Sequence, residues 1–129
     1  MKTTVRLMLV LVALFVAAPG FAGEAAQMWK CEMDDDATEK AVKDRAQTWL
    51  EAAKKLDGGE NLKAYVFFPV AVNAVGEMDM MFIVIAPSFT EWGMFWDAYA
   101  NSPVNVIDEH GKDLIVCPNS VLWESFPVK

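Results

Sequence analysis

The chain has 129 residues and a formal net charge of −7, from 18 acidic and 11 basic side chains. Its length fits one domain, and its acidic balance disfavours binding to nucleic acids and to anionic membrane surfaces. It has no Gly-rich phosphate loop and no zinc-ligand spacing, and its single histidine leaves no Ser-His-Asp set. We therefore expect no nucleic acid partner and no cofactor.

The first 22 residues have the pattern of a secretory signal peptide. Lys2 and Arg6 form a basic start, and an unbroken apolar run extends from Leu7 to Ala18. Small residues at positions 20 and 22 then precede a cleavage site. A membrane-spanning helix needs about 20 apolar residues, which is longer than this run. The pattern therefore predicts cleavage after Ala22 and no membrane segment in the mature chain.

The mature chain, residues 23–129, is expected to form a single domain in the periplasm or outside the cell. It contains two cysteines, Cys31 and Cys117. Exported proteins meet an oxidising environment, in which paired thiols become disulfides. The absence of a C-x-x-C spacing and of a flanking histidine disfavours a redox or metal pair. We predict a Cys31–Cys117 disulfide that closes a long loop and stabilises the fold.

A strand and a helix are predicted in the first half of the mature chain. Residues 27–33 alternate between apolar and polar side chains, which is typical of a strand with one buried face. A helix is expected from Ala37 to Leu56, with Asp36 as its N-cap and Glu39 completing a capping box. Its apolar stripe has helical spacing and consists of Val42, Ala46, Trp49, Leu50, Ala53 and Leu56.

Two apolar segments follow, at residues 64–72 and 80–86. Their aromatic and β-branched residues favour strands, and the turn residues 73–79 between them predict a β-hairpin. Pro69 lacks a backbone donor, which places it at a sheet edge or a bulge.

The last part of the chain is expected to hold one helix and one strand. Ser88 and Glu91 form a second capping box, and the helix is predicted to end near Asn101, before Pro103. Its aromatic stripe consists of Phe89, Trp92, Trp96 and Tyr99. We then expect an extended piece at 104–107, a polar turn at 108–112, a strand at 114–117, and a tail at 118–129 whose apolar residues, Val121, Leu122, Trp123 and Phe126, dock on the core.

The order strand, helix, strand, strand, helix, strand predicts a ferredoxin-like α+β fold, with a four-stranded antiparallel sheet and two helices on one face. The first and last strands are neighbours in that fold, and these strands carry Cys31 and Cys117. Because the hairpin strands are apolar on both sides, the uncovered sheet face is expected to be an association surface. We therefore predict a homodimer packed sheet to sheet about a two-fold axis.

The element order, the doubly apolar hairpin and the segment Ala86-Pro87-Ser88-Phe89-Thr90-Glu91-Trp92 resemble the dimeric α+β barrel proteins, over about residues 27–117. That superfamily includes cofactor-independent monooxygenases, stress-response barrel proteins and members of unknown role. The resemblance implies a cleft between sheet and helices that binds a small, flat or apolar molecule. Nothing here matches the His-, Asn- and Trp-based sites of the monooxygenases, so their activity is not transferred.

The candidate ligand-binding residues are aromatic: Trp49, Tyr65, Trp92, Trp96 and Tyr99. Such residues suit a cleft for an aromatic or lipid-like molecule, although packing in the core is the alternative. We expect non-catalytic binding of a small molecule or a partner. The alternative is a cofactor-independent monooxygenase or isomerase, which needs a polar group with a shifted pKa. A buried carboxylate, or Asn73, pointing into the pocket would favour the enzyme.

Metal sites are weakly indicated. Met78 and Met80 share one strand face and suggest Cu(I) binding outside the cytoplasm as a second alternative, but methionine is also a common filler of cores. The adjacent acids 34–36 lack the spacing of a calcium loop. His110 is expected in an exposed turn, where it serves neither as a haem ligand nor as a general base. We predict no metal ligands.

Overall fold

Four strands pair in one antiparallel sheet in the structure, a computed structural model that describes residues 23–71 and 79–129. The strands are β1 (Glu24–Met33), β2 (Lys63–Phe67), β3 (Met80–Ala86) and β4 (Ile115–Ser125). Their order across the sheet is β2-β3-β1-β4. The predicted signal peptide and residues 72–78, which include Asn73, Met78 and most of the predicted turn, lie outside the described residues.

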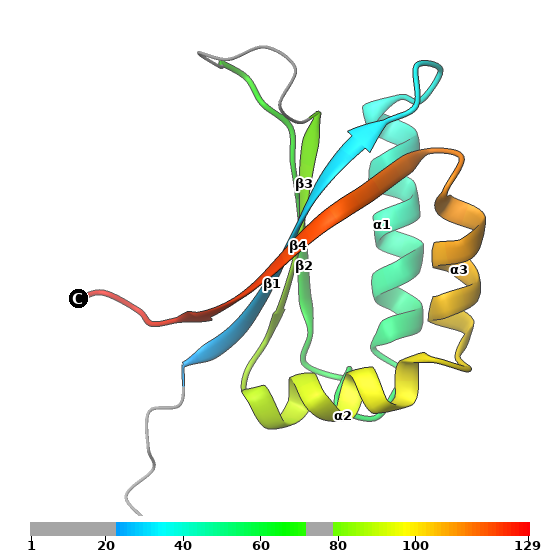
Figure 1. The fold of residues 1–129 in the computed structure, drawn as a ribbon. Helices are drawn as coiled ribbons and strands as arrows, with labels where there is room; N and C mark the ends of the chain where they lie inside the picture. The colour runs from blue at the N-terminus through cyan, green and yellow to red at the C-terminus, as the bar shows by residue number, and fades with distance from the viewer. Residues whose placement is uncertain (1–22, 72–78) are drawn as a thin grey trace, which may run out of the picture.

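Three helices cover one face of this sheet: α1 (Glu39–Ala53), α2 (Phe89–Tyr99) and α3 (Pro103–Gly111). In Figure 1 the sheet is seen nearly edge-on, and all three helices lie to its right, with α1 and α3 side by side and α2 across their lower ends. The predicted ferredoxin-like α+β fold is confirmed, but the helical layer contains one helix more than predicted.

Helix α1 begins later than predicted. Its N-cap is Thr38, whose hydroxyl accepts a hydrogen bond from the Ala41 backbone N–H, and not Asp36. Either residue type can cap a helix; here Asp34 takes up the preceding turn, because its carboxylate accepts from the Asp36 N–H. The predicted apolar stripe does face the sheet, and Val42, Trp49 and Ala53 are its buried residues.

Helix α2 begins as predicted. The Ser88 hydroxyl accepts from the Glu91 backbone N–H and lies 3.1 Å from the Glu91 carboxylate. The aromatic stripe is only partly buried, since Phe89 is 40% exposed. The fully buried side chain of this helix is Phe95, which the predicted stripe omits.

Helix α3 corrects the prediction of an extended piece at 104–107 and a polar turn at 108–112. The Ser102 hydroxyl caps it by accepting from the Val104 and Asn105 N–H groups, and Pro103 occupies the first turn. Proline fits that position because the first helical N–H groups have no partner within the helix. Val104 is fully buried, so this helix packs into the core.

Strand β4 is also longer than predicted. It continues through the expected tail to Ser125 and pairs with β1 as far as Glu24. The tail does not dock on the core: Trp123 is 54% exposed and Phe126 is 56% exposed. Strand β2, in contrast, ends at Phe67, before Pro69 and well short of residue 72.

The predicted disulfide is present. Cys31 on β1 and Cys117 on β4 are joined, and both cysteines lie beside a register shift in the pairing of these strands. The bond connects residues 86 positions apart in the sequence. The bond joins β1 to β4, which are neighbours in the sheet, so the disulfide and the strand order agree.

The pairing register assigns each strand residue to one face. Helix-facing side chains from β1 and β3 form the core with α1 and α2, and include Ala25, Cys31, Met80, Val84 and Ala86. The opposite face, here called the open face, carries Met28, Tyr65, Phe67, Met81, Ile83, Ile85, Val121 and Trp123. In Figure 1 this face has no helix on it. None of the described helices is long and apolar enough to cross a membrane.

Candidate functional site

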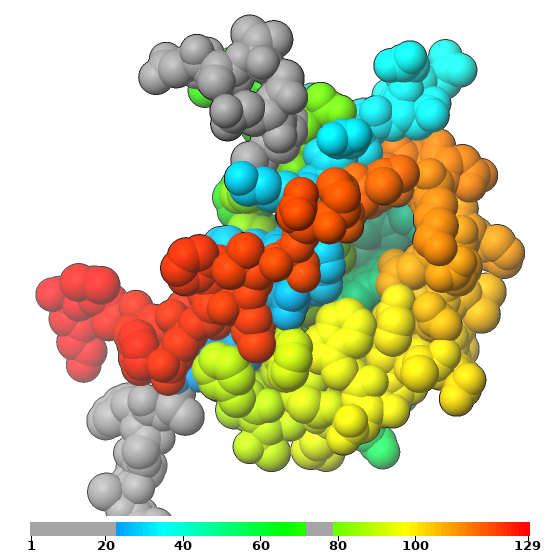
Figure 2. Space-filling view, viewed as in Figure 1, coloured from blue at the N-terminus to red at the C-terminus, as the bar shows by residue number. Residues whose placement is uncertain are grey.

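A cavity of about 390 Å³ lies between the helix-facing side of the sheet and the helical layer. Its walls come from all three helices and from β1, β3 and β4. Figure 2 shows the hollow between β4 and helices α2 and α3, with α1 visible at its base. Its size falls in the range of about 300–1,000 Å³ that is typical of small-molecule pockets.

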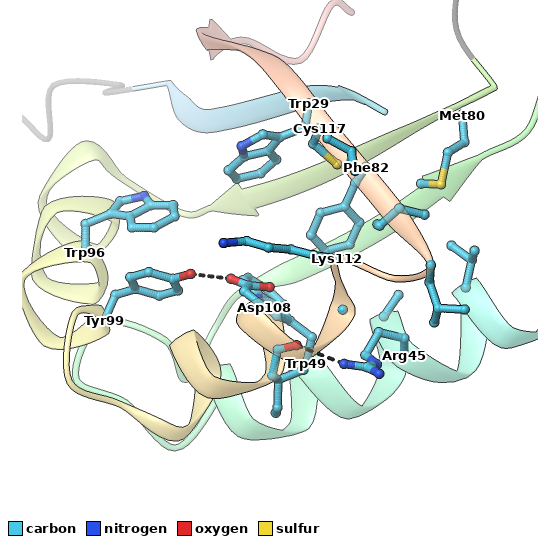
Figure 3. Close-up of a pocket in the computed structure, with 17 residues that line it drawn as sticks. Trp29, Arg45, Trp49, Met80, Phe82, Trp96, Tyr99, Asp108, Lys112 and Cys117 are labelled. Atoms are coloured by element: carbon cyan, nitrogen blue, oxygen red, sulfur yellow. Dashed lines mark hydrogen bonds between the residues drawn. The ribbon is translucent and has the colours of Figure 1, made fainter. Parts of the chain in front are cut away.

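Aromatic rings form much of the wall, and they belong to Trp29, Trp49, Phe82, Trp96 and Tyr99. The Trp96 ring centroid lies 6.2 Å from that of Trp29 and 4.7 Å from that of Tyr99. On the other side, Trp49 meets Phe82 edge to face at 5.3 Å. Figure 3 shows these rings around one space. Such a wall suits the flat faces of an aromatic or apolar molecule.

The polar side of the cavity is centred on Asp108, from α3. The Tyr99 hydroxyl donates a hydrogen bond to one oxygen of its carboxylate (Figure 3). Tyr99 is the last residue of α2 and Asp108 lies on α3, so this hydrogen bond connects the two helices. Val104, Asp108 and Gly111 recur at helical spacing on α3, which explains why this carboxylate faces inward with the buried residues.

Burial raises the pKa of the Asp108 carboxyl above its ordinary value, and the nearby Glu109 charge adds to the rise. Hydrogen bonding by Tyr99 and Trp49, together with the charge of Arg45, acts in the opposite direction. Burial likewise raises the pKa of the Tyr99 hydroxyl, and the adjacent Asp108 reinforces this effect. Tyr99 therefore keeps its proton at physiological pH and remains a hydrogen-bond donor.

Two basic residues complete the lining, Arg45 from α1 and Lys112 from the end of α3. The Arg45 Nη1 donates to the Ile107 carbonyl oxygen at 2.8 Å, which joins α1 to α3. The Lys112 Nζ lies 2.7 Å from the Glu109 carboxylate, and both side chains of this pair are largely exposed. Both cations thus have partners other than Asp108, although both side chains border the cavity.

Three of the five predicted ligand-binding residues line the cavity: Trp49, Trp96 and Tyr99. Trp92 packs on Trp96 in the core instead, and its indole N–H is buried without a partner among the described residues. Tyr65 lies on the open face of β2 and is 46% exposed. The structure therefore brings Trp49, Trp96 and Tyr99 together around the cavity. Their role in ligand binding stays a prediction.

Asp108 and Lys112 were missed as cavity residues because the sequence predicts a turn at residues 108–112, and Arg45 lies outside the apolar stripe predicted for its helix. The signal that identifies α3 is Ser102-Pro103, an N-cap residue followed by proline at the first helical position. A helix starting there places Asp108 on the same side as Val104. Trp29 was recognised as a strand residue facing the core, but a single strand does not reveal that its ring borders a cavity.

Residues considered as metal ligands lie in other surroundings. Met80 is fully buried beside Cys31 and Val42 and borders the cavity. His110 is exposed on α3, and not in a turn. Asp34 caps a turn through the Asp36 N–H. Within residues 23–71 and 79–129, no three His, Cys, Asp or Glu side chains cluster as a metal site would require.

The fold and the cavity together define a ferredoxin-like α+β domain with a ligand-sized cleft between sheet and helices. No protein-family model and no curated protein matches the sequence. The class therefore rests on the strand order and connections described above.

Among solved structures, the chain is similar to a dimeric ferredoxin-like protein of unknown function from Thermobifida fusca, with 13% identity, a TM-score of 0.48, and coverage of 81% of this chain and 93% of that one. A dimeric protein of unknown function with a ferredoxin-like fold from Bacteroides fragilis has 12% identity, a TM-score of 0.44, and coverage of 81% and 99%. A chlorite dismutase mutant from Candidatus Nitrospira defluvii has 12% identity and a TM-score of 0.44 over 84% of this chain. The chain spans less than half the length of the chlorite dismutases it matches, 44% and 42%.

Proposed function

We propose that this chain is an exported protein that binds a small, largely apolar or aromatic molecule in the cavity between its sheet and its helices, without catalysing a reaction on it. The observation that carries the proposal is the cavity of about 390 Å³ with its aromatic walls. Pockets of this kind bind ligands through apolar area and a few placed polar groups. Here the polar groups are Tyr99, Asp108 and Arg45.

Export is supported by the pattern of the first 22 residues and by the Cys31–Cys117 disulfide, because disulfides persist in oxidising compartments. The test is expression of the full chain in a bacterial host followed by fractionation. We expect a periplasmic or secreted product whose N-terminal residue is Gly23. An uncleaved product that stays in the cytoplasm would contradict this part of the proposal.

The open face supports a homodimer. Tyr65, Phe67, Val121 and Trp123 are each between 46% and 54% exposed there, and apolar side chains gathered on one sheet face favour burial against a partner. A second copy of the chain is the simplest occupant, because a two-fold axis presents the same face to itself. Sheet-to-sheet packing would leave both cavities accessible on the outer, helical sides.

Ligand binding can be tested with N-phenyl-1-naphthylamine, a neutral aromatic probe whose fluorescence rises in apolar surroundings. We compare the wild type with Gly111→Leu, because a Cβ at Gly111 borders the cavity and would meet the Arg45 Nη1 at 3.4 Å, an ordinary contact. The longer side chain should occupy the cavity. We expect the wild type to bind the probe and Gly111→Leu to bind it at least about tenfold more weakly, a change of about 1.4 kcal/mol in binding free energy.

Gly93→Leu is the matched control, since a Cβ at Gly93 on α2 meets nothing within 4 Å. It should bind the probe as the wild type does, and both variants should give the wild-type circular dichroism spectrum. Equal binding by the wild type and Gly111→Leu would place the probe outside the cavity and contradict the proposal.

A second candidate function is catalysis by Asp108 in the same cavity. The observation in its favour is a partly buried carboxyl with a raised pKa that faces a pocket, the property expected of a general acid or base. If the protein is an enzyme, its bound molecule should change mass on incubation, and Asp108→Asn should still bind that molecule but stop the conversion. A ligand recovered unchanged from the wild type would leave binding as the function.

A further inference from the structure

The Asp108 carboxylate lacks a counter-ion at close range. Within the described residues it forms no ion pair with Arg45 or Lys112, and its hydrogen bonds, from Tyr99 and Trp49, come from neutral groups. Withdrawing an ionised carboxylate from water without a partner costs free energy. The cavity therefore presents a negative charge that an incoming positive group would compensate.

The groups facing Asp108 do not supply that compensation. Arg45, from α1, directs its Nη1 to the Ile107 carbonyl oxygen at 2.8 Å. Lys112 also borders the cavity, but its Nζ is paired with the Glu109 carboxylate at 2.7 Å, and both side chains of this pair are largely exposed. Tyr99, from α2, donates to Asp108 and holds its own proton. The two nearby basic residues are thus engaged elsewhere, and Arg45 acts on Asp108 only through its field.

The walls around this carboxylate are the faces and edges of aromatic rings. The ring centroids of Trp29 and Trp96 lie 6.2 Å apart, and those of Trp96 and Tyr99 lie 4.7 Å apart. Trp49 also lines the cavity (Figure 3). Ring faces attract cations, and tryptophan does so most strongly. Aromatic rings with one carboxylate form the arrangement that recognises ammonium groups carrying apolar substituents.

We propose that the cavity selects an organic cation, a substituted ammonium compound whose charged group pairs with Asp108 and lies against the rings of Trp29, Trp96 and Tyr99. This inference rests on the proposed function and names the chemical class of its ligand. A neutral molecule would leave the carboxylate with only its neutral hydrogen bonds and the field of Arg45, and an anion would bring a like charge next to it.

The test uses three soluble probes of the same shape and different charge: choline, its neutral carbon isostere 3,3-dimethylbutan-1-ol, and the anion 3,3-dimethylbutanoate. Isothermal titration calorimetry on the oxidised wild-type protein measures the affinity for each. We expect choline to bind at least tenfold more tightly than the alcohol, and the anion to bind more weakly than either.

Asp108→Asn should lower the affinity for choline at least tenfold and change the affinity for the alcohol less than twofold. Asp44→Asn is the matched control, because Asp44 is 63% exposed on α1 and pairs with Lys40. It should bind choline as the wild type does. A conservative Trp96→Phe variant should retain part of the preference for choline, since phenylalanine keeps a ring face.

Equal affinities for choline and the alcohol, unaffected by Asp108→Asn, would overturn the cation inference while leaving the cavity a binding site. Tighter binding of the anion would overturn it as well. A different result would contradict the proposed function, namely equal binding of the neutral naphthylamine probe by the wild type and by Gly111→Leu. The two failures are therefore distinguishable.

Discussion

At the residue scale, Asp108 couples the cavity to the stability of the fold. Its carboxyl contributes stability when neutral and opposes folding when ionised, because burial raises its pKa in the folded state above the unfolded value of 3.8. The stabilising contribution is fully present below pH 3.8 and is lost as the pH rises through the folded pKa. At neutral pH the fold therefore tolerates a charge that it does not need for packing.

We predict that Asp108→Asn, which is neutral at every pH, unfolds at a higher temperature than the wild type at pH 7. The difference should shrink as the pH falls through the raised pKa of the wild-type carboxyl, because the carboxyl then takes up its proton. Thermal unfolding followed by circular dichroism between pH 4 and pH 8 measures it. Asp44→Asn should show no such trend, and a difference for Asp108→Asn that stays constant with pH would refute the role of burial.

At the scale of elements, α3 positions the polar side of the cavity. It supplies Asp108 and, at its C-cap, Lys112, and its Ile107 carbonyl oxygen accepts the hydrogen bond from Arg45. The helix is nine residues long, and isolated helices of this length are unstable in water. It therefore depends on its cap at Ser102 and on the burial of Val104. Loss of either would release the polar side of the cavity.

Ser102→Ala removes the hydroxyl that accepts from the Val104 and Asn105 N–H groups. We expect it to lower the free energy of unfolding by about 1 kcal/mol and to weaken binding of the naphthylamine probe. Urea unfolding followed by tryptophan fluorescence measures the first effect. The control Ser120→Ala, at an exposed strand position, should remain within about 0.5 kcal/mol of the wild type. Equal stability of the two variants would show that the cap is dispensable.

The sequence was sufficient for the elements with strong local signals. The alternation of β1, the apolar hairpin strands and the Ser88 capping box led to the correct fold, and the topology agreed with the disulfide. It was insufficient for α3, because Pro103 was taken as the end of one helix instead of the start of the next. That single misassignment hid Asp108, since a carboxylate in a turn is solvated while one on a packed helix face is not.

The extent of β4 could not be derived from local signals either. Residues 118–125 begin with proline and contain few alternating apolar positions, so their strand conformation depends on pairing with β1 over its full length. The exposed aromatic Trp123 then falls on the open face, opposite Ala26. This tertiary constraint appears only when the two strands are brought together.

At the scale of the whole molecule, the disulfide closes most of the described chain into one loop. A sequence separation of 86 residues corresponds in the chain-entropy model to about 4–5 kcal/mol of stabilisation. We predict that the Cys31→Ser and Cys117→Ser double variant loses a large part of this amount, measured by urea unfolding under non-reducing conditions. Unfolding of the wild type in reducing agent should match the variant. Indistinguishable oxidised and reduced midpoints would contradict a stabilising role.

The proposed homodimer pairs the open faces of two copies of the chain. We predict that Tyr65→Glu combined with Val121→Glu gives a monomer, because the two charges would be buried in a sheet-to-sheet interface. Light scattering after size exclusion measures the mass. The control is Val106→Glu on α3, where the side chain is 53% exposed on the helical side, and this variant should remain a dimer. A wild-type monomer, or a dimer in the doubly substituted variant, would rule out this interface.

The measurement that tests the central claim most directly is native mass spectrometry of the wild type and of Gly111→Leu, each isolated from the exported fraction without reducing agent. The wild type is expected to be a disulfide-bonded dimer that carries an additional small molecule, and Gly111→Leu to be the same dimer without it. Identical additional masses on both proteins would place the bound molecule outside the cavity, and a bare wild type that also fails to bind the naphthylamine probe would contradict ligand binding altogether.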